Sequence, residues 1–292
     1  MAEKRQGNVS NSVSDNFFKL KPQNLKLNMQ QITTEDLLNA GVHYGHLTRK
    51  WHPAMAPYIF MEKNGIHLVD VNQTMVQLNK AAHALKQIAK SGKKILFVST
   101  KNQFRDIIVT AANKLNMPYV TERWLGGMLT NFSTIRKSIK KLSNIEKMMT
   151  ENSFENISKK EKLMISRNKL KLERVLKGIA DLNRLPAAIF VVDIKRESIA
   201  IREAQKLNIP TFAIVDTNSD PGIVDFVIPA NDDASTSVAL LTSVLFDAIE
   251  EGLTERRREK EETGKPIVQT EAVKETLEVK AVSETISTPA VA

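Results

Sequence analysis

The histidines are the first residues of this chain with a potential for metal chemistry. All five lie between positions 43 and 83, and His43, His46 and His52 are close enough in sequence to suggest a metal site. Their spacing matches no strong metal-binding pattern, and Gly45 interrupts the helix that would align the first two. The chain has no cysteine, which excludes thiolate zinc sites, disulfides and cysteine nucleophiles. The pattern favours structural or RNA-stacking histidines over metal ligands.

Asp193 and Asp216 each follow a predicted buried strand, and active sites of open α/β sheets gather at such positions. An enzyme that uses a nucleotide is therefore one alternative. However, the sequence contains no G-x-G-x-x-G motif, and the triplet at 92–94 (GKK) lacks the other residues of a P-loop. Aspartate is also a common helix cap, and Asp193 precedes a predicted helix at 197–207. We therefore favour the cap over catalysis.

Basic and aromatic residues occur together in two short segments, residues 49–53 (RKWHP) and residues 123–128 (RWLGGM). Cations suit phosphate groups, aromatic rings suit stacking on bases, and glycine permits close approach of the backbone. In the first segment we expect Arg49 and Lys50 to be exposed and functional. In the second segment we expect Trp124 to lie in the core.

The net charge of +9 is concentrated in one internal segment. Residues 130–184 contain fourteen Lys and Arg against six Asp and Glu, whereas the tail from residue 251 contains seven against nine. This concentration favours an anionic partner, and nucleic acid before membrane, because no long apolar face accompanies the charge. The pairs Arg136-Lys137 and Lys140-Lys141 are four residues apart and share a helix face that could meet several phosphates. A merely solvated face is the alternative.

The composition, 42% hydrophobic and 26% charged, is that of a globular protein, and we expect it to be soluble and intracellular. Short apolar runs alternate with amphipathic stretches, which predicts an α/β fold with a mainly parallel sheet of about five strands. Capping boxes that start at Thr74 and Thr100 are expected to begin two of the helices. Strands are predicted at residues 66–71, 94–99, 119–121, 187–192, 211–215 and 226–228.

The basic segment has a helical period, with a break at residues 150–158. This predicts an antiparallel helical hairpin or short coiled coil at 130–184, inserted into a discontinuous α/β domain made of 29–129 and 185–250. Residues 1–28 are predicted to be disordered, and residues 251–292 to be a helix end followed by a disordered tail. The expected apolar seam of the hairpin consists of Ile135, Ile139, Leu142, Ile145 and Met149 on the first helix and Leu163, Leu170, Val175, Ile179 and Leu182 on the second.

Four separated segments, in this order, resemble the bacterial small-subunit ribosomal protein S-two family. They are residues 37–60 (LLNAGVHYGHLTRKWHPAMAPYIF), 122–142 (ERWLGGMLTNFSTIRKSIKKL), 186–210 (PAAIFVVDIKRESIAIREAQKLNIP) and 213–230 (AIVDTNSDPGIVDFVIPA). The resemblance covers about residues 29–250. Members of this family typically begin near the position of Met29. Residues 1–28 are therefore expected either to precede the true start or to form an RNA-binding extension.

The resemblance implies a Rossmann-like α/β domain that carries a coiled-coil hairpin, in a non-enzymatic component of the cytoplasmic ribosome. The implied partners are small-subunit ribosomal RNA and other small-subunit proteins, including the large OB-repeat protein that captures messenger RNA. A membrane, DNA, a metal and a cofactor are not expected. A coiled-coil interaction protein that does not bind RNA is an alternative. By matching position, the expected RNA contacts are Arg49, Lys50, Trp51, Arg123, Arg136, Lys137, Lys140 and Lys141.

Overall fold

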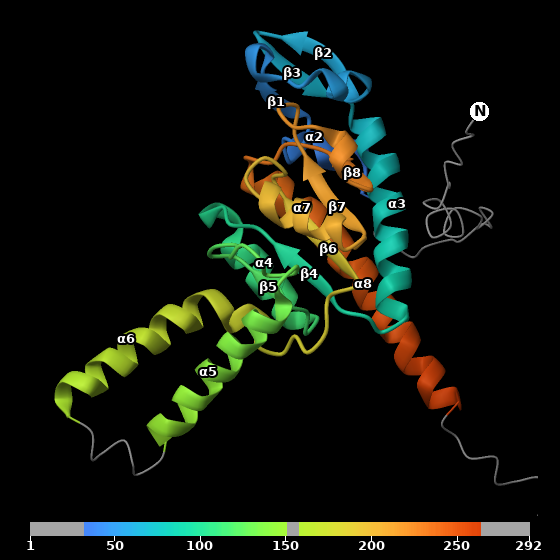
Figure 1. The fold of residues 1–292 in the computed structure, drawn as a ribbon. Helices are drawn as coiled ribbons and strands as arrows, with labels where there is room; N and C mark the ends of the chain where they lie inside the picture. Colours follow the sequence, from blue (N-terminus) through green and yellow to red (C-terminus); the bar gives the residue numbers. More distant parts are fainter. Residues whose placement is uncertain (1–31, 151–157, 264–292) are drawn as a thin grey trace, which may run out of the picture. The chain divides into compact units, whose positions relative to one another are not determined.

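The computed structural model describes residues 32–150 and 158–263 (Figure 1), so the predictions for 1–28 and for 264–292 lie outside the described residues. Its centre is an all-parallel sheet with the strand order β5-β4-β6-β7-β8. The prediction of a Rossmann-like α/β fold with a parallel sheet of about five strands is therefore confirmed. The strands are β4 (Ile95–Val98), β5 (Tyr119–Val120), β6 (Ala188–Val192), β7 (Thr211–Val215) and β8 (Phe226–Pro229).

The three inner strands, β4, β6 and β7, are buried along their whole length, which explains why they are continuous apolar runs. One face of the sheet, with Phe97 and Phe190 on it, meets α8 (Ser235–Thr263), where the rings of Phe97 and Phe246 are 4.7 Å apart. Helix α8 in turn packs on α3 (Val71–Lys90).

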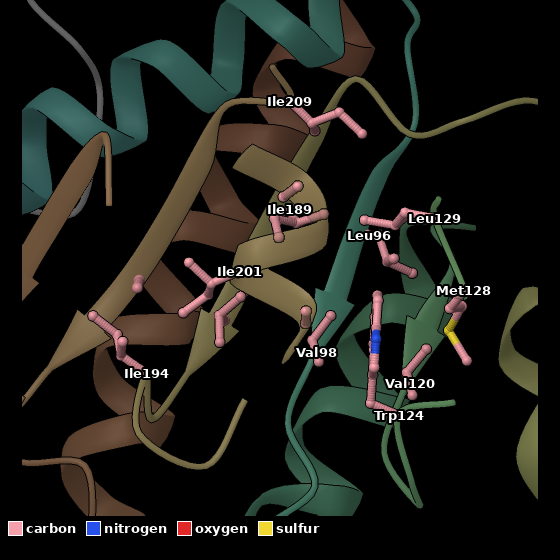
Figure 2. Packing of buried hydrophobic residues seen from close by; sticks show 14 of the residues in the cluster. Leu96, Val98, Val120, Trp124, Met128, Leu129, Ile189, Ile194, Ile201 and Ile209 are labelled. Carbon is pink, nitrogen blue, oxygen red and sulfur yellow. The ribbon is translucent and has the colours of Figure 1, made fainter. Parts of the chain in front are cut away.

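The opposite face of the sheet carries the main apolar cluster (Figure 2). Residues of β4 and β6 that alternate with the phenylalanines, such as Val98 and Ile189, pack there against Ile201 of α7 (Ser198–Lys206). Trp124 is 8% exposed and belongs to the same cluster, which confirms that it is a core residue. The remaining helix of the domain is α4 (Arg105–Lys114), which follows β4.

The chain before α3 forms a second, antiparallel sheet in the order β1-β3-β2, which the sequence did not predict as a unit. Its strands are β1 (Tyr44–Leu47), β2 (Ile59–Lys63) and β3 (Ile66–Val69), preceded by the short helix α2 (Thr34–Asn39). Of these three strands, the sequence predicted only β3, which falls within the expected range 66–71. The other two strands each have several exposed residues, so they lack the apolar run that marks a buried strand.

Both predicted capping boxes are wrong. Helix α3 starts four residues earlier than expected, with Asp70 as its cap, and Thr74 is buried inside the helix, where its hydroxyl donates to the carbonyl of Pro229. Thr100 precedes a 3-10 turn rather than a helix, and both its amide and its hydroxyl donate to the carboxylate of Glu197. In both cases a distant partner satisfies the hydroxyl, and local spacing cannot reveal such a partner.

The basic segment contains two helices, α5 (Phe132–Thr150) and α6 (Lys159–Leu176), which contact each other. Ile135, Leu142 and Ile145 of α5 are buried as expected. The predicted seam of the second helix is wrong at Leu163 and Leu170, which are 51% and 62% exposed. Leu172 and Leu176 take that place and pack into the main cluster. The coiled coil itself stays a prediction.

The base of α6 is held against the edge strand β5 at Gly178. A Cβ atom at this position would lie 2.2 Å from the carbonyl oxygen of Tyr119, so only glycine fits without a shift of the backbone. We expect Gly178→Ala to lower the free energy of unfolding by about 1–3 kcal/mol, the usual cost of overpacking. Gly126→Ala is the matched control, because no atom lies within 4 Å of its added Cβ. Denaturant unfolding measures both, and equal effects of the two variants would contradict this packing.

None of the helices that the structure describes between residues 32 and 263 has the length and apolar character needed to cross a lipid bilayer.

Candidate nucleic-acid interface

The four basic residues predicted to contact RNA on the first hairpin helix are all exposed on α5. Arg136 and Lys140 are one helical turn apart, and so are Lys137 and Lys141. The helix buries Ile135, Leu142 and Ile145 on a different face, so the cations need not move for an anion to reach them. Among the described residues, none of the four forms an ion pair. The arrangement therefore presents uncompensated positive charge along one helix face.

The loop that leads into α5 is organised by a buried carboxylate, Glu203 of α7, which is 7% exposed. One carboxylate oxygen accepts hydrogen bonds from the indole Nε1 of Trp124 at 3.2 Å and from the amide of Gly127 at 2.7 Å. The other oxygen accepts from the amide of Leu129 at 2.9 Å and from the amide and hydroxyl of Thr130. Glu203 therefore fixes the chain immediately before α5 begins.

The electrostatic balance at Glu203 favours its charged form. Burial by itself would raise the pKa of this carboxyl, but the hydrogen bonds from Leu129, Thr130, Gly127 and Trp124 together lower the pKa below its ordinary value. A carboxylate that accepts several backbone N–H groups is stabilised in just this way. Glu203 is thus ionised at neutral pH and neutralised by the dipoles of the loop.

Arg123 lies in the same loop and is exposed, as expected for a phosphate contact. Its neighbour Glu122 has a structural role. The carboxylate of Glu122 forms ion pairs with Arg105 of α4 at 2.9 Å and with Arg174 of α6 at 2.8 Å. This bridge links α6 to the sheet domain. Arg123 is thus exposed and forms no ion pair within the described ranges, whereas its acidic neighbour holds the second basic helix.

The third group of predicted contacts lies in a 3-10 turn (Thr48–Lys50) that follows β1. Arg49 and Lys50 are exposed, and Trp51 is 40% exposed with its ring 5.1 Å from that of His67. This turn is fixed by the small antiparallel sheet and by Thr217 after β7, whose carbonyl accepts from the amide of His52. The turn and α5 are thus positioned by different parts of the fold.

A cluster that sequence analysis only partly foresaw lies at the carboxyl ends of the parallel strands. The ammonium of Lys101, which follows β4, is 3.0 Å from both Asp193 and Asp232 and 2.8 Å from Asp233. His46 of β1 lies between Asp216 at 3.0 Å and Asp233 at 3.3 Å. Lys101, His46 and three of the aspartates line a cavity of about 350 Å³. Asp193 and Asp216 therefore lie in one charged cluster.

The chemistry available to this cluster is cation binding. One ligand atom each from His46, Asp216 and Asp232 lie within 4.8 Å of one another and could hold a metal ion. His43 and His52 are not part of this set, so the three-histidine site that the sequence suggested does not form. The ring of His43 lies 4.0 Å from that of Tyr44 in a tilted arrangement, and Nδ1 of His52 accepts from the amide of Ala54.

The cap predicted at Asp193 is only partly right. Its carboxylate accepts from the amide of Arg196 at 3.1 Å, in the turn before α7, whereas the cap position of the helix itself is Glu197. The chain turns at Asp193 with φ +70°, which places the carboxylate close to Lys101. The same carboxylate that caps the turn therefore takes part in the charged cluster.

The pKa of Asp232 is raised to about 7, first by burial and then by the charges of Asp216 and Asp193. The folded state therefore keeps a proton that the unfolded chain, with an ordinary pKa of 3.8, has already lost. We expect this carboxyl to make the protein less stable as the pH rises from about 4 to about 7. Asp232→Asn should remove that contribution. The stability of the variant minus that of the parent should therefore be larger at pH 8 than at pH 4.5. Thermal unfolding at both pH values measures this, and a constant difference would contradict it.

Sequence reasoning missed Glu203, Lys101 and Asp232. The last two could have been found, because each follows a strand at the edge where Asp193 and Asp216 were expected. Glu203 carried only a weak signal: it lies three residues after the buried Ala200, at the margin of the apolar face of α7. Its partners are more than seventy residues away in sequence.

Comparison with known proteins gives a consistent result. The family model described as Ribosomal protein S2 matches residues 37–252. The small ribosomal subunit protein uS2 of Cytophaga hutchinsonii is 64% identical over 233 residues, which cover 80% of this chain and 92% of that protein. The protein of the same name from Flavobacterium johnsoniae is 59% identical over 231 residues, covering 79% of this chain and 91% of that protein. These matches confirm the resemblance of the four segments, and the chain belongs to the ribosomal protein S2 family.

Proposed function

We propose that the chain binds small-subunit ribosomal RNA through the exposed cations of α5, the turn at Thr48–Lys50 with Trp51, and Arg123. The observation that carries this proposal is the row of exposed cations on α5, which form no ion pair with any residue that the structure describes, at the start of a helix that Glu203 fixes to the sheet domain. Lys and Arg on a fixed helix face neutralise successive phosphates and release their counter-ions, which is the dominant source of affinity for nucleic acid. Trp51 adds a partly exposed ring on which a base can stack.

As a member of the ribosomal protein S2 family, the chain is a structural component of the small ribosomal subunit and not an enzyme. In bacteria the ribosome is cytoplasmic, and we infer the same location for this chain. The parallel sheet then serves as a platform: it holds the basic helices on one side and offers the rest of its surface to neighbouring proteins. A nucleotide-using enzyme is disfavoured because the sequence has no glycine-rich phosphate-binding motif. The cavity at the strand ends carries mixed charge, with three aspartates and three basic residues besides His46 in its lining.

The proposal also includes a protein partner. We infer that the sheet domain, residues 29–129 and 185–250, supports docking of the large OB-repeat protein that captures messenger RNA. Membership of the ribosomal protein S2 family supports this inference. The first helix of the basic hairpin, α5, then supplies four of the eight proposed RNA contacts.

A direct test is the salt dependence of RNA binding. The full chain is titrated with small-subunit ribosomal RNA at a series of salt concentrations. If the eight proposed contacts include about five phosphates, the logarithm of the association constant should fall with the logarithm of salt with a slope of about −4. Transfer RNA at equal nucleotide concentration is the control and should bind more weakly. A binding constant that does not change with salt, or the absence of binding at low salt, would contradict the proposal.

A further inference from the structure

The outer face of α6 is an exposed surface that neither the fold nor the proposed RNA contacts use. The α6 stripe consists of Lys160, Leu163, Met164, Arg167, Leu170 and Lys171, which recur at intervals of three and four residues and therefore share one side of the helix. Leu163, Met164 and Leu170 are 51%, 57% and 62% exposed. The helix anchors itself through other residues, Leu172 and Leu176, so these three apolar side chains contribute little to the fold.

The charges of the stripe are all positive. Lys160, Arg167 and Lys171 are exposed, and none of them forms an ion pair with a residue in the described ranges. The two acidic residues of α6, Glu161 and Glu173, fall on other sides of the helix. The stripe therefore combines three cations with three large aliphatic side chains, a pattern that calls for a partner with both negative charge and apolar surface.

The contrast with α5 separates this surface from an RNA-binding face. On α5 the exposed cations Lys137 and Lys141 share their face with one exposed apolar side chain, Met148, which is 42% exposed, whereas the α6 stripe carries three such side chains. Protein surfaces that bind RNA stack bases on aromatic rings or arginine planes. Helix α6 contains no aromatic residue, and its exposed apolar groups are leucine and methionine. Aliphatic groups at helical spacing are instead the usual anchors of a helix–helix contact.

A cavity at one end of the stripe supports the same conclusion. It has a volume of about 480 Å³, and its lining includes Leu170 of the stripe and the apolar side chain of Val109. Charged residues of both signs also line it, among them Arg105, Glu122 and Glu173. The Nε atom of Arg105 is buried there and donates to no described residue. The guanidinium of Arg105 is already paired with Glu122 at 2.9 Å, so the cavity offers a partner mainly the apolar surface of Leu170 and Val109.

We propose that the α6 stripe and this cavity bind an acidic amphipathic helix of another protein of the small subunit. The aliphatic residues of that helix pack on Leu163, Met164 and Leu170, and its carboxylates meet Lys160, Arg167 and Lys171. The inference rests on the proposed function in one respect, because it requires the chain to be assembled into the subunit. It gives α6 a role separate from that of α5: one helix holds RNA and the other holds a protein.

Site-specific photo-crosslinking in assembled small subunits tests this. A benzoylphenylalanine replaces Met164 in the full chain, and the same group at Asn144, an exposed position among the cations of α5, is the matched control. At position 164 we expect crosslinks to a protein segment with excess acidic residues and apolar residues at helical spacing. At position 144 we expect crosslinks to RNA. Charge reversal by Lys160→Glu, Arg167→Glu and Lys171→Glu should lower the yield at position 164 at least fivefold.

Three results would overturn the inference. If the chain is present in small subunits but position 164 crosslinks to RNA, or to a basic or non-helical protein segment, the occupant is wrong while the proposed function stands. If charge reversal leaves the crosslink yield unchanged, the cations do not select the partner. If the chain is absent from small subunits, the proposed function fails, and this inference fails with it.

Discussion

Replacing Glu203 with alanine is expected to lower the free energy of unfolding by about 3–5 kcal/mol, the largest effect of any single substitution outside the apolar core. The substitution leaves the indole of Trp124 and the amide of Leu129 without an acceptor in a buried position. Each buried donor left unsatisfied costs about 1–3 kcal/mol, and several lose their partner together. Because the same carboxylate holds the loop before α5, we also expect weaker RNA binding by the folded fraction.

Two matched variants separate this role from a general effect of mutation. Glu203→Gln keeps the shape and one acceptor oxygen, so its effect should fall between those of the parent and Glu203→Ala. Arg202→Ala removes an exposed side chain from the same helix and should change stability by less than about 0.5 kcal/mol. Denaturant unfolding followed by the fluorescence of Trp124 and Trp51 measures all three. A loss below about 1 kcal/mol for Glu203→Ala would contradict the role assigned to this carboxylate.

The same site predicts sensitivity to acid. The pKa of Glu203 is lower in the folded state than its ordinary value of 4.5, so its contribution to stability is fully present above pH 4.5. That contribution is lost as the pH falls through the folded pKa. We therefore expect the difference in stability between the parent and Glu203→Gln to shrink below pH 4.5. A difference that is independent of pH down to pH 3 would show that the charge of Glu203 does not matter.

Neutralising the α5 cations together is expected to weaken RNA binding by about 100-fold or more at physiological salt. The variant is Arg136→Gln, Lys137→Gln, Lys140→Gln and Lys141→Gln, which keeps the helix-forming character of α5. Each lost phosphate contact reduces the magnitude of the slope of binding against salt by about 0.8, so the slope should fall in magnitude by up to about 3. Stability should change little, because all four side chains are exposed.

The matched control removes the same charge elsewhere. Four exposed cations outside the basic helices are changed to glutamine: Lys80, Lys93, Arg202 and Lys206. If net charge alone draws the RNA, both variants will bind equally weakly. If α5 is the contact surface, the control variant will lose only a few-fold in affinity. Unchanged RNA affinity and unchanged association of the α5 variant with the subunit would support a hairpin that contacts proteins only.

The parallel sheet was predictable because β4, β6 and β7 are buried on both faces, which leaves an unbroken apolar run in the sequence. The same signal fails for β1 and β2, in which two of four and four of five residues are exposed and none is buried. Helix starts were harder to predict: Thr74 and Thr100 have the right spacing for caps, yet their hydroxyls bond to Pro229 and Glu197. The local sequence does not show whether a hydroxyl group will bond to a nearby amide or to a partner that is distant in the chain.

The residues of the candidate site also differ in how far the sequence predicts them. Exposed cations such as Arg136 and Lys140 were predictable, because charge and helical spacing are properties of a short segment. The residue that positions them, Glu203, was not predictable, because its partners come from the loop around Trp124 and Leu129, far away in sequence. The α6 stripe was hidden for a related reason: an exposed leucine such as Leu170 looks the same in sequence as a buried one, and only the fold shows that Leu172 faces the core.

The most direct measurement is sedimentation of a cell lysate at near-physiological salt and magnesium, with the chain located by immunoblot before and after nuclease treatment. We predict that the chain migrates with the small subunit in a one-to-one ratio, that nuclease releases it, and that higher salt weakens its association. Migration at the size of the free protein under every condition would contradict a structural role in the subunit and the RNA-binding surface proposed for α5.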